Sequence, residues 1–193
     1  VLDMSKIESG HMKVHEEVFD IAELMKEVAV LMQGQLEETG ITHRKHRANI
    51  QHTMLKGDTL QLQRIMMNLF SNAVKYNKKN GTIDTYASEI SCDGKIVVYE
   101  FKIVDTGIGM SKEFIENELF QPFTQEKADA RTKYKGTGLG MSIVKGLIER
   151  MNGEIQVEST PGEGTEITFR LRFALAQEEN GKKKTDGNGE QDD

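Results

Sequence analysis

Residues 96–110 read IVVYEFKIVDTGIGM, and this stretch decides the fold. Its first part alternates and then becomes continuously apolar, which is typical of a strand in the middle of a sheet. Asp105 follows at once, and a carboxylate at the end of a buried strand is costly unless it meets a donor. Gly107 and Gly109 permit positive φ and the close approach of a ligand. A base with an exocyclic amine would satisfy Asp105, whereas an ordinary turn with a capping Asp is the alternative.

Further strands are expected on both sides of this stretch. A β-rich run at 82–90 precedes it, and the intervening Ser91-Cys92-Asp93-Gly94 is a turn signal. The segments 154–159 and 165–173 are expected to be strands around the turn Pro161-Gly162-Glu163-Gly164. Weaker candidates for strands are 12–19, which is a short strand or a linker, 41–50 and 51–56.

Three amphipathic helices are predicted from apolar residues that recur every three or four positions. Asp20 and Asp58 stand at N-cap positions, and an acid or an amide three residues later completes a capping box. Gly40 ends the first helix, the third spans 139–151, and Ser111 is expected to cap a fourth, short helix. The predicted buried stripes are Ile21, Leu24, Val28, Leu31, Met32 and Leu36; Leu62, Ile65, Met66, Leu69, Phe70 and Ala73; and Ile143, Val144, Leu147, Ile148 and Met151.

These elements sum to an α+β fold. They predict a two-layer α/β sandwich, in which a mixed sheet of about five strands is covered on one face by three helices. Helices and strands come in clusters along the chain, so a parallel doubly wound sheet with strict βαβ alternation fits less well.

Composition excludes several classes of protein. The chain has 193 residues, which suits one domain with extensions. It contains no run of the ~20 apolar residues that span a bilayer, and no signal peptide opens it. A single cysteine, Cys92, excludes an intrachain disulfide framework and a CxxC zinc site. The net charge of −6 argues against a general nucleic-acid binder.

Three segments are predicted along the chain. Residues 1–19 begin VLDMSKIESG, whose partial apolar stripe looks like the end of a helix followed by a linker. Residues 20–175 form the main domain. Residues 176–193 are expected to be a disordered acidic tail or linker, because from 177 onward six acids and three Lys occur without one hydrophobic residue.

Two more glycine clusters have candidate roles. Gly136-Thr137-Gly138-Leu139-Gly140-Met141 opens a helix, and the exposed amides of a helix N-terminus favour phosphate. The cluster follows a charged segment instead of a strand, so the dinucleotide-binding fingerprint does not apply. Residues 162–165 read GEGT, which by itself is a hairpin turn.

A pair of asparagines completes the set of polar motifs. Asn68 and Asn72 are four apart and therefore share one face of a helix. Their amide oxygens are hard ligands that suit magnesium, and Lys75 can reach a phosphate. A solvated polar helix face is the alternative interpretation.

In this order and spacing, the motifs resemble the ATP-binding domain of sensor histidine kinases. That family belongs to the Bergerat-fold group, with type II topoisomerases, heat-shock chaperone ATPases and mismatch-repair ATPases. NLFSNAVKY (68–76) looks like the family's N box, and DTGIGM (105–110) and GTGLGM (136–141) look like its two glycine boxes. FQPF (120–123) looks like its phenylalanine box, and GEGTEITF (162–169) looks like its closing segment. The resemblance covers roughly residues 1–175, and VLDMSKIESG looks like the end of the family's dimerization and phosphoacceptor hairpin.

The resemblance implies roles for individual residues. Asn72 would bind Mg²⁺ with support from Asn68, Asp105 would accept from the adenine amino group, and Tyr76 would lie against the adenine or ribose. Within the charged segment 124–135, which is expected to be a loop or lid, Arg131, Lys133 or Lys135 would meet the γ-phosphate. The full implied ATP site is Asn68, Asn72, Lys75, Tyr76, Asp105, Gly107, Gly109, Arg131, Lys133, Gly136, Thr137, Gly138, Leu139, Gly140 and Thr165.

The resemblance implies an enzyme, a protein histidine kinase, that transfers the γ-phosphate of ATP to a histidine. The family's acceptor has His, then an acid, an apolar residue and a Pro further on, and none of the five histidines here fits that pattern. The acceptor is therefore expected on a helical hairpin outside this chain, and no catalytic residue is assigned within it. Asn68 stands where related ATPases usually have a water-activating glutamate, and an amide cannot act as that base.

The implied partners follow from that role. They are ATP, the acceptor hairpin of the same parent protein and, indirectly, a response regulator receiver domain, with no nucleic acid. The parent is expected to be a homodimer, and the domain to be cytoplasmic whether or not the parent carries a membrane anchor. The alternatives are a serine kinase of the anti-sigma-factor type on the same fold, or a nucleotide-sensing module without kinase activity.

Overall fold

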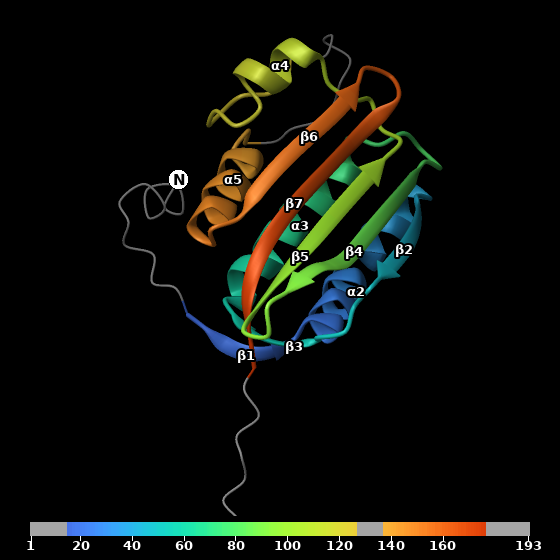
Figure 1. Cartoon of the computed structure of the whole chain (residues 1–193). Helices are drawn as coiled ribbons and strands as arrows, with labels where there is room; N and C mark the ends of the chain where they lie inside the picture. Colours follow the sequence, from blue (N-terminus) through green and yellow to red (C-terminus); the bar gives the residue numbers. More distant parts are fainter. Residues whose placement is uncertain (1–14, 127–136, 177–193) are drawn as a thin grey trace, which may run out of the picture.

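The apolar stretch that precedes the first glycine cluster forms the middle of the sheet. The computed structural model describes residues 15–126 and 137–176 (Figure 1). In it, Ile96–Asp105 is strand β5, which lies between β7 and β4. The other elements are β1 (Glu17–Asp20), α2 (Ile21–Thr39), β2 (Thr42–Ala48), β3 (Met54–Gly57), α3 (Thr59–Lys75), β4 (Thr82–Cys92), α4 (Lys112–Asn117), α5 (Gly140–Arg150), β6 (Glu154–Thr160) and β7 (Gly164–Leu175).

The sheet is mixed, as predicted. Its strand order is β1-β3-β7-β5-β4-β2, and β6 pairs with β7 beside β3. Strand β2 runs parallel to β4, while the remaining pairs are antiparallel. Five strands are long and form the body of the sheet, whereas β1 and β3 have four residues each and extend it at the end of β7.

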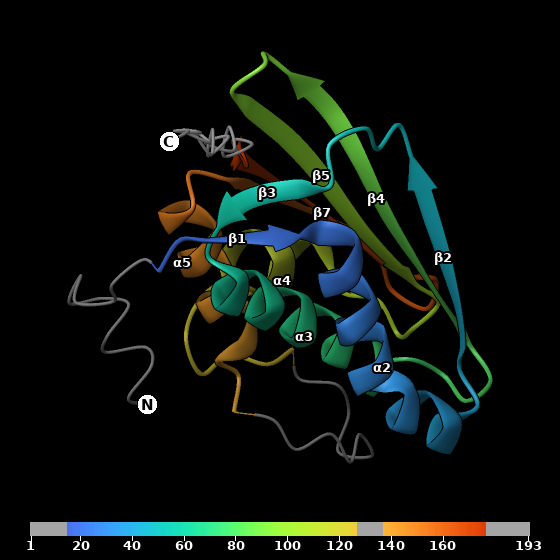
Figure 2. The same cartoon turned by 90° about the horizontal axis from the view of Figure 1, so that it is seen from below.

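Helices α2, α3 and α5 lie on one face of the sheet (Figure 2). Along β5, Val97, Tyr99, Phe101 and Ile103 are buried against this layer, so alternate residues supply the core. The opposite face is polar, for example at the Arg170 Nε–Glu100 Oε2 ion pair of 2.7 Å. The α+β prediction of a sheet covered on one face by three helices is confirmed.

The predicted helix starts are correct, but neither capping box is complete. Asp58 Oδ1 accepts from the amide of Gln61 at 3.1 Å, as expected, whereas Gln61 Oε1 is buried and has no hydrogen-bond partner among the described residues. Asp20 Oδ1 accepts from the amide of Ala22 at 2.8 Å, while Glu23 pairs with Lys26 at 2.5 Å. In α2, therefore, Glu23 forms an ion pair on the helix surface and does not cap the N-terminus.

One predicted core position is wrong. Leu31 is 56% exposed, although Val28 and Met32 in the same stripe of α2 are buried and Leu36 is partly buried. Helix α2 lies at one edge of the helix layer, with another helix, α3, on one side of it only (Figure 2), so its buried stripe is narrow. All six residues of the stripe predicted in α3, the central helix, are buried.

Three sequence predictions fall outside the described residues. They are the helix end in 1–10, the tail from 177 onward, and the basic residues Arg131, Lys133 and Lys135 of the loop or lid. Among residues 15–126 and 137–176, no helix combines the length and apolar composition that a bilayer crossing requires.

Candidate functional site

Asp105 ends β5 directly opposite Thr165 of β7. Its Oδ1 accepts from the amide of Gly107 at 2.8 Å, and the amide of Thr165 also donates to the carboxylate. Burial raises the pKa of Asp105 to about 6, although these two amides act to lower it. A carboxyl with this pKa is largely ionised at neutral pH and is stabilised by any further donor that reaches it.

The first glycine cluster is packed between the end of α3 and the β6–β7 turn. The amide of Ile108 donates to the carbonyl of Tyr76 at 3.0 Å, and the amide of Gly162 donates to the carbonyl of Ile108 at 2.7 Å. Gly109 has a φ of +66°, and a Cβ there would overlap the carbonyl oxygen of Thr160. The loop after Asp105 is therefore built around a position that only glycine fits.

Gly109→Ala is expected to destabilise the protein more than Gly162→Ala. Gly162 also has a positive φ, +81°, but nothing lies within 4 Å of an added Cβ, so only the left-handed backbone costs about 1–2 kcal/mol. At Gly109 the overlap with Thr160 adds to that cost. Urea denaturation of both variants measures the difference, with Gly34→Ala in the open middle of α2 as control. Equal losses at Gly109 and Gly162 would contradict the tight packing of the loop.

The third glycine cluster lies against the first. Gly164 approaches the backbone of Asp105 so closely that a Cβ there would overlap the Asp105 carbonyl. Ser159 Oγ donates to the carbonyl of Gly164 at 2.7 Å, contacts Thr165 Oγ1 at 2.9 Å and accepts from the amide of Met110 at 2.8 Å. The hairpin interpretation is correct locally, yet the turn also braces Asp105. Sequence reasoning missed Ser159, because nothing in the local pattern marks it.

The asparagine pair faces the N-terminus of α5. A Cβ on Gly140 would lie 3.5 Å from Asn68 Oδ1 and 3.7 Å from Asn72 Nδ2. Asn68 Nδ2 donates to the carbonyl of Arg64 at 2.9 Å, so its oxygen points away from its own backbone partner. Leu139, the N-cap residue of α5, provides no side-chain cap for the first turn. The side-chain amides of Asn68 and Asn72 therefore lie beside the start of α5.

Lys75 and Tyr76 lie together at the end of α3. Lys75 Nζ donates to Tyr76 Oη at 3.0 Å and stands 4.7 Å from the centre of the ring. The carbonyl of Tyr76 accepts a hydrogen bond from the amide of Ile108 in the glycine loop. This contact fixes the position of Tyr76 relative to Asp105, which begins the loop.

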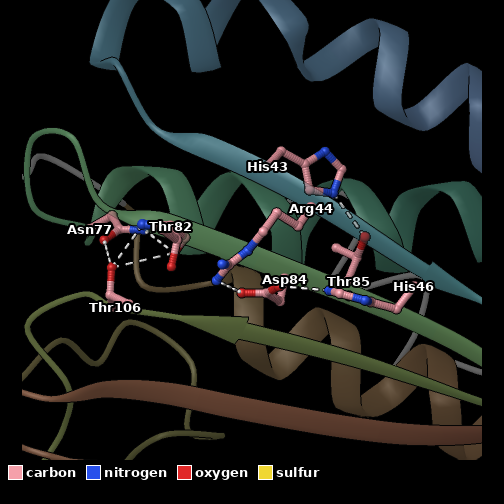
Figure 3. Close-up of polar contacts among 8 residues, drawn as sticks. All are labelled: His43, Arg44, His46, Asn77, Thr82, Asp84, Thr85 and Thr106. Atoms are coloured by element: carbon pink, nitrogen blue, oxygen red, sulfur yellow. Dashed lines mark hydrogen bonds and ion pairs between the residues drawn. The ribbon is translucent and has the colours of Figure 1, made fainter.

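A buried hydrogen-bond network supports this end of the site, and sequence reasoning missed it (Figure 3). Asn77, which is 6% exposed, donates from Nδ2 to the carbonyl of Thr82 at 3.1 Å. Thr106 Oγ1 donates to Asn77 Oδ1 at 3.1 Å and accepts from the amide of Thr82 at 2.9 Å. The network joins the end of α3, the start of β4 and the glycine loop.

The second glycine cluster meets the phenylalanine segment. The amide of Phe123 donates to the carbonyl of Gly138 at 3.1 Å, and the amide of Leu139 donates to Thr137 Oγ1 at 3.4 Å. The Phe123 side chain is 68% exposed. Gly136, which begins this cluster, lies outside the described residues.

A cavity of about 60 Å³ lies elsewhere, between α2, β2 and α3. His43 lines it, with Nε2 2.8 Å from Thr85 Oγ1 (Figure 3) and its ring 4.7 Å from that of Phe70. Burial, followed by the charge of Lys45, lowers the pKa of His43 to about 4, so the ring is neutral at pH 7. The cavity shares no residue with the glycine clusters or the asparagine pair.

Comparison with known proteins gives a consistent result. The family model described as histidine kinase-, DNA gyrase B-, and HSP90-like ATPase matches residues 57–175. Sensor protein GacS of Pseudomonas syringae is 35% identical over 184 residues, which are 93% of this chain and 20% of that protein. Sensory/regulatory protein RpfC of Xanthomonas campestris is 32% identical over 92% of this chain and 24% of that protein. The chain thus spans about a fifth to a quarter of the length of these relatives.

Solved structures show the same architecture. Full-length ShkA in complex with AMPPNP superposes with a TM-score of 0.75 at 29% identity, over 91% of this chain and 35% of that one. The histidine kinase ThkA in complex with the response regulator protein TrrA has a TM-score of 0.67 at 20% identity, over 89% of this chain and 46% of that one. The second likeness shows the fold alone.

Proposed function

Because the chain belongs to the family of histidine kinase-, DNA gyrase B- and HSP90-like ATPases, we propose that it is the ATP-binding catalytic domain of a sensor histidine kinase. The observation that carries the proposal is the convergence of four separate motifs at one end of the sheet. Asp105, the glycine loop and Thr165 meet at one place, and Gly140 stands over Asn68 and Asn72 beside it. We assign this domain to residues 20–175.

Asp105 and its neighbours hold the base. The carboxylate accepts a hydrogen bond from the exocyclic amine of adenine. Because the acceptor is a half-buried anion, this bond is stronger than one between neutral groups. Gly107 and Gly109 shape the pocket, because they let the loop pack closely against Tyr76 and Thr160, while Thr165 and Tyr76 border the base. The network of Asn77 and Thr106 fixes the loop, so the pocket is formed before the nucleotide binds.

The asparagines and the start of α5 hold the phosphates. The amides at the start of α5, from Gly138 through Leu139 to Gly140, favour negative charge, and the Leu139 side chain provides no cap for them. The amide oxygen of Asn72 suits Mg²⁺, which prefers hard oxygen ligands and keeps several waters, and Asn68 supports the metal and phosphate site. When bound, the ion neutralises phosphate charge. Lys75 supplies a further cation, and Thr137, Gly136, Arg131 and Lys133 complete the phosphate side.

The nucleotide is kept for transfer to a protein. Asn68 is a neutral amide and cannot activate water, so hydrolysis is slow. The chain orients the γ-phosphate toward a histidine on the helical hairpin of its parent, and catalysis consists mainly of positioning and charge neutralisation. The further partners are a response regulator, reached through that hairpin, and a second copy of the parent. The relatives named as sensor kinases make the serine kinase and the sensing module less favoured alternatives.

Calorimetric titration tests the proposal. ADP with Mg²⁺ is expected to bind at one site per chain, and chelation of Mg²⁺ is expected to weaken the affinity for ATP analogues. GDP is expected to bind much more weakly, because guanine presents a carbonyl to Asp105 where adenine presents an amine. No binding of ADP would overturn the proposal, and equal affinities for ADP and GDP would remove Asp105 from the base pocket.

A further inference from the structure

Three metal-binding side chains gather at the other end of β4 from the glycine loop. They are His52 in the β2–β3 connection and Glu89 and Cys92 of β4. One donor atom from each lies within 4.8 Å of the others. All three residues are half-buried, so the cluster belongs neither to the exposed surface nor to the core.

A β-bulge creates this arrangement. In a regular strand, residues three apart point to opposite faces of the sheet, which would separate Glu89 from Cys92. The pairing of β4 with β5 shifts between Glu89 and Ser91, so that Glu89 lies opposite Tyr99 and Cys92 opposite Val97. Because Tyr99 and Val97 both face the core, Glu89 and Cys92 come to the same face.

Hydrogen bonds hold the carboxylate and the histidine in place. Glu89 Oε2 accepts from the amides of Gln51 and His52 at 2.8 and 3.0 Å, and Oε1 lies 2.8 Å from His52 Nδ1. Tyr99 Oη donates to the carbonyl of His52 at 2.6 Å. Such contacts around a ligand set fix its orientation, as the outer shell of a metal site does.

We propose that His52, Glu89 and Cys92 bind one zinc ion, with water as the fourth ligand. Imidazole, carboxylate and thiolate are all zinc ligands, and this mixed set suits zinc better than magnesium or calcium. The ion would take the place of the His52–Glu89 hydrogen bond and tie the β2–β3 connection to the bulge. The single cysteine excludes a CxxC site but not this set. The structural alternative is that a hydrogen bond between His52 and Glu89 holds the connection while Cys92 packs against the hydrophobic core.

Cobalt and zinc titrations of the full chain test the site. The metal-free, reduced protein is titrated with Co²⁺ in the presence of ADP and Mg²⁺, which occupy the nucleotide site. One equivalent is expected to produce a thiolate-to-cobalt charge-transfer band, and Zn²⁺ is expected to displace it. Zinc is also expected to raise Tm, since an ion that binds only the folded chain stabilises it.

Single substitutions distinguish zinc binding at this site from zinc binding elsewhere on the chain. Cys92→Ser is expected to abolish the charge-transfer band and, like His52→Ala, to lower zinc affinity by at least about tenfold. Cys92 is the milder change, because its sulfur accepts only a long contact from the amide of Gly94, 3.4 Å. His46→Ala is the control, since His46 pairs with Asp84 on the open face (Figure 3). Absence of zinc binding, or unchanged affinity in both variants, would overturn the site and leave the nucleotide proposal untouched.

Discussion

Asp105→Asn is expected to weaken the binding of ADP by roughly ten- to hundredfold. The substitution removes a charge-assisted hydrogen bond to the adenine amine, which is typically worth ~1.5–3 kcal/mol. It also replaces one carboxylate oxygen with an NH₂ group, which then faces a donor, either the adenine amine or a backbone amide. Calorimetric titration measures the change, and Glu27→Gln, an exposed acid on α2, is the matched control that also removes one negative charge.

The same substitution is expected to stabilise the nucleotide-free protein at neutral pH. Burial raises the pKa of Asp105 from 3.8 to about 6. A raised pKa favours folding below pH 3.8, and that contribution is lost as the pH rises through 6. Above pH 6 the ionised carboxylate therefore lowers the free energy of unfolding by up to about 3 kcal/mol. The lost hydrogen bond to Gly107 or Thr165 offsets part of the gain in the variant.

Urea denaturation at two pH values distinguishes these effects. The variant is expected to be more stable than the wild type at pH 7.5 and no more stable at pH 4, where Asp105 is protonated in the folded protein. A higher free energy of unfolding in the variant at pH 7.5, together with weaker ADP binding, would place Asp105 in the base pocket. Wild-type affinity in the folded variant would sink that assignment.

The second large effect is expected at Asn72. Asn72→Ala should lower phosphotransfer to a separately supplied acceptor hairpin by more than about a hundredfold, because a metal ion contributes several kcal/mol of charge stabilisation in the transition state. The wild-type chain alone should take up no phosphate, since none of its histidines has the acceptor pattern. Transfer to the hairpin needs high hairpin concentration, because the two are no longer covalently linked.

Radiolabelled ATP measures the transfer. The reactions are the chain alone, the chain with the hairpin of its parent protein, the same mixture with the acceptor histidine replaced by alanine, and the Asn72→Ala chain with the hairpin. Gln33→Ala removes an exposed amide from α2 and should transfer as the wild type does. Label on the lone chain would reveal an acceptor within it. No label on the hairpin, with ADP binding intact, would favour the nucleotide-sensing module.

Local patterns were sufficient for most of the fold. The alternation of 96–104 places β5 in the core, and Asp58 starts α3 where the sequence predicts, because periodicity and capping depend on neighbours in the chain. For the site, the residue types of the motifs predict a base pocket and a phosphate side. Their individual roles, including those of Arg131 and Lys133 outside the described residues, remain predictions.

Contacts between distant segments were decided by the tertiary structure. Ser159 accepts from Met110 only because β6 and β7 bring it beside the glycine loop, and Asn77 is buried only because Thr106 and Thr82 meet it there. The exposure of Leu31 reflects the outer position of α2, which the periodicity of one helix does not reveal. The bulge that turns Glu89 and Cys92 to one face arises from the register of β4 against β5. Strand register is set by the pairing of whole strands, so no local stretch of sequence contains it.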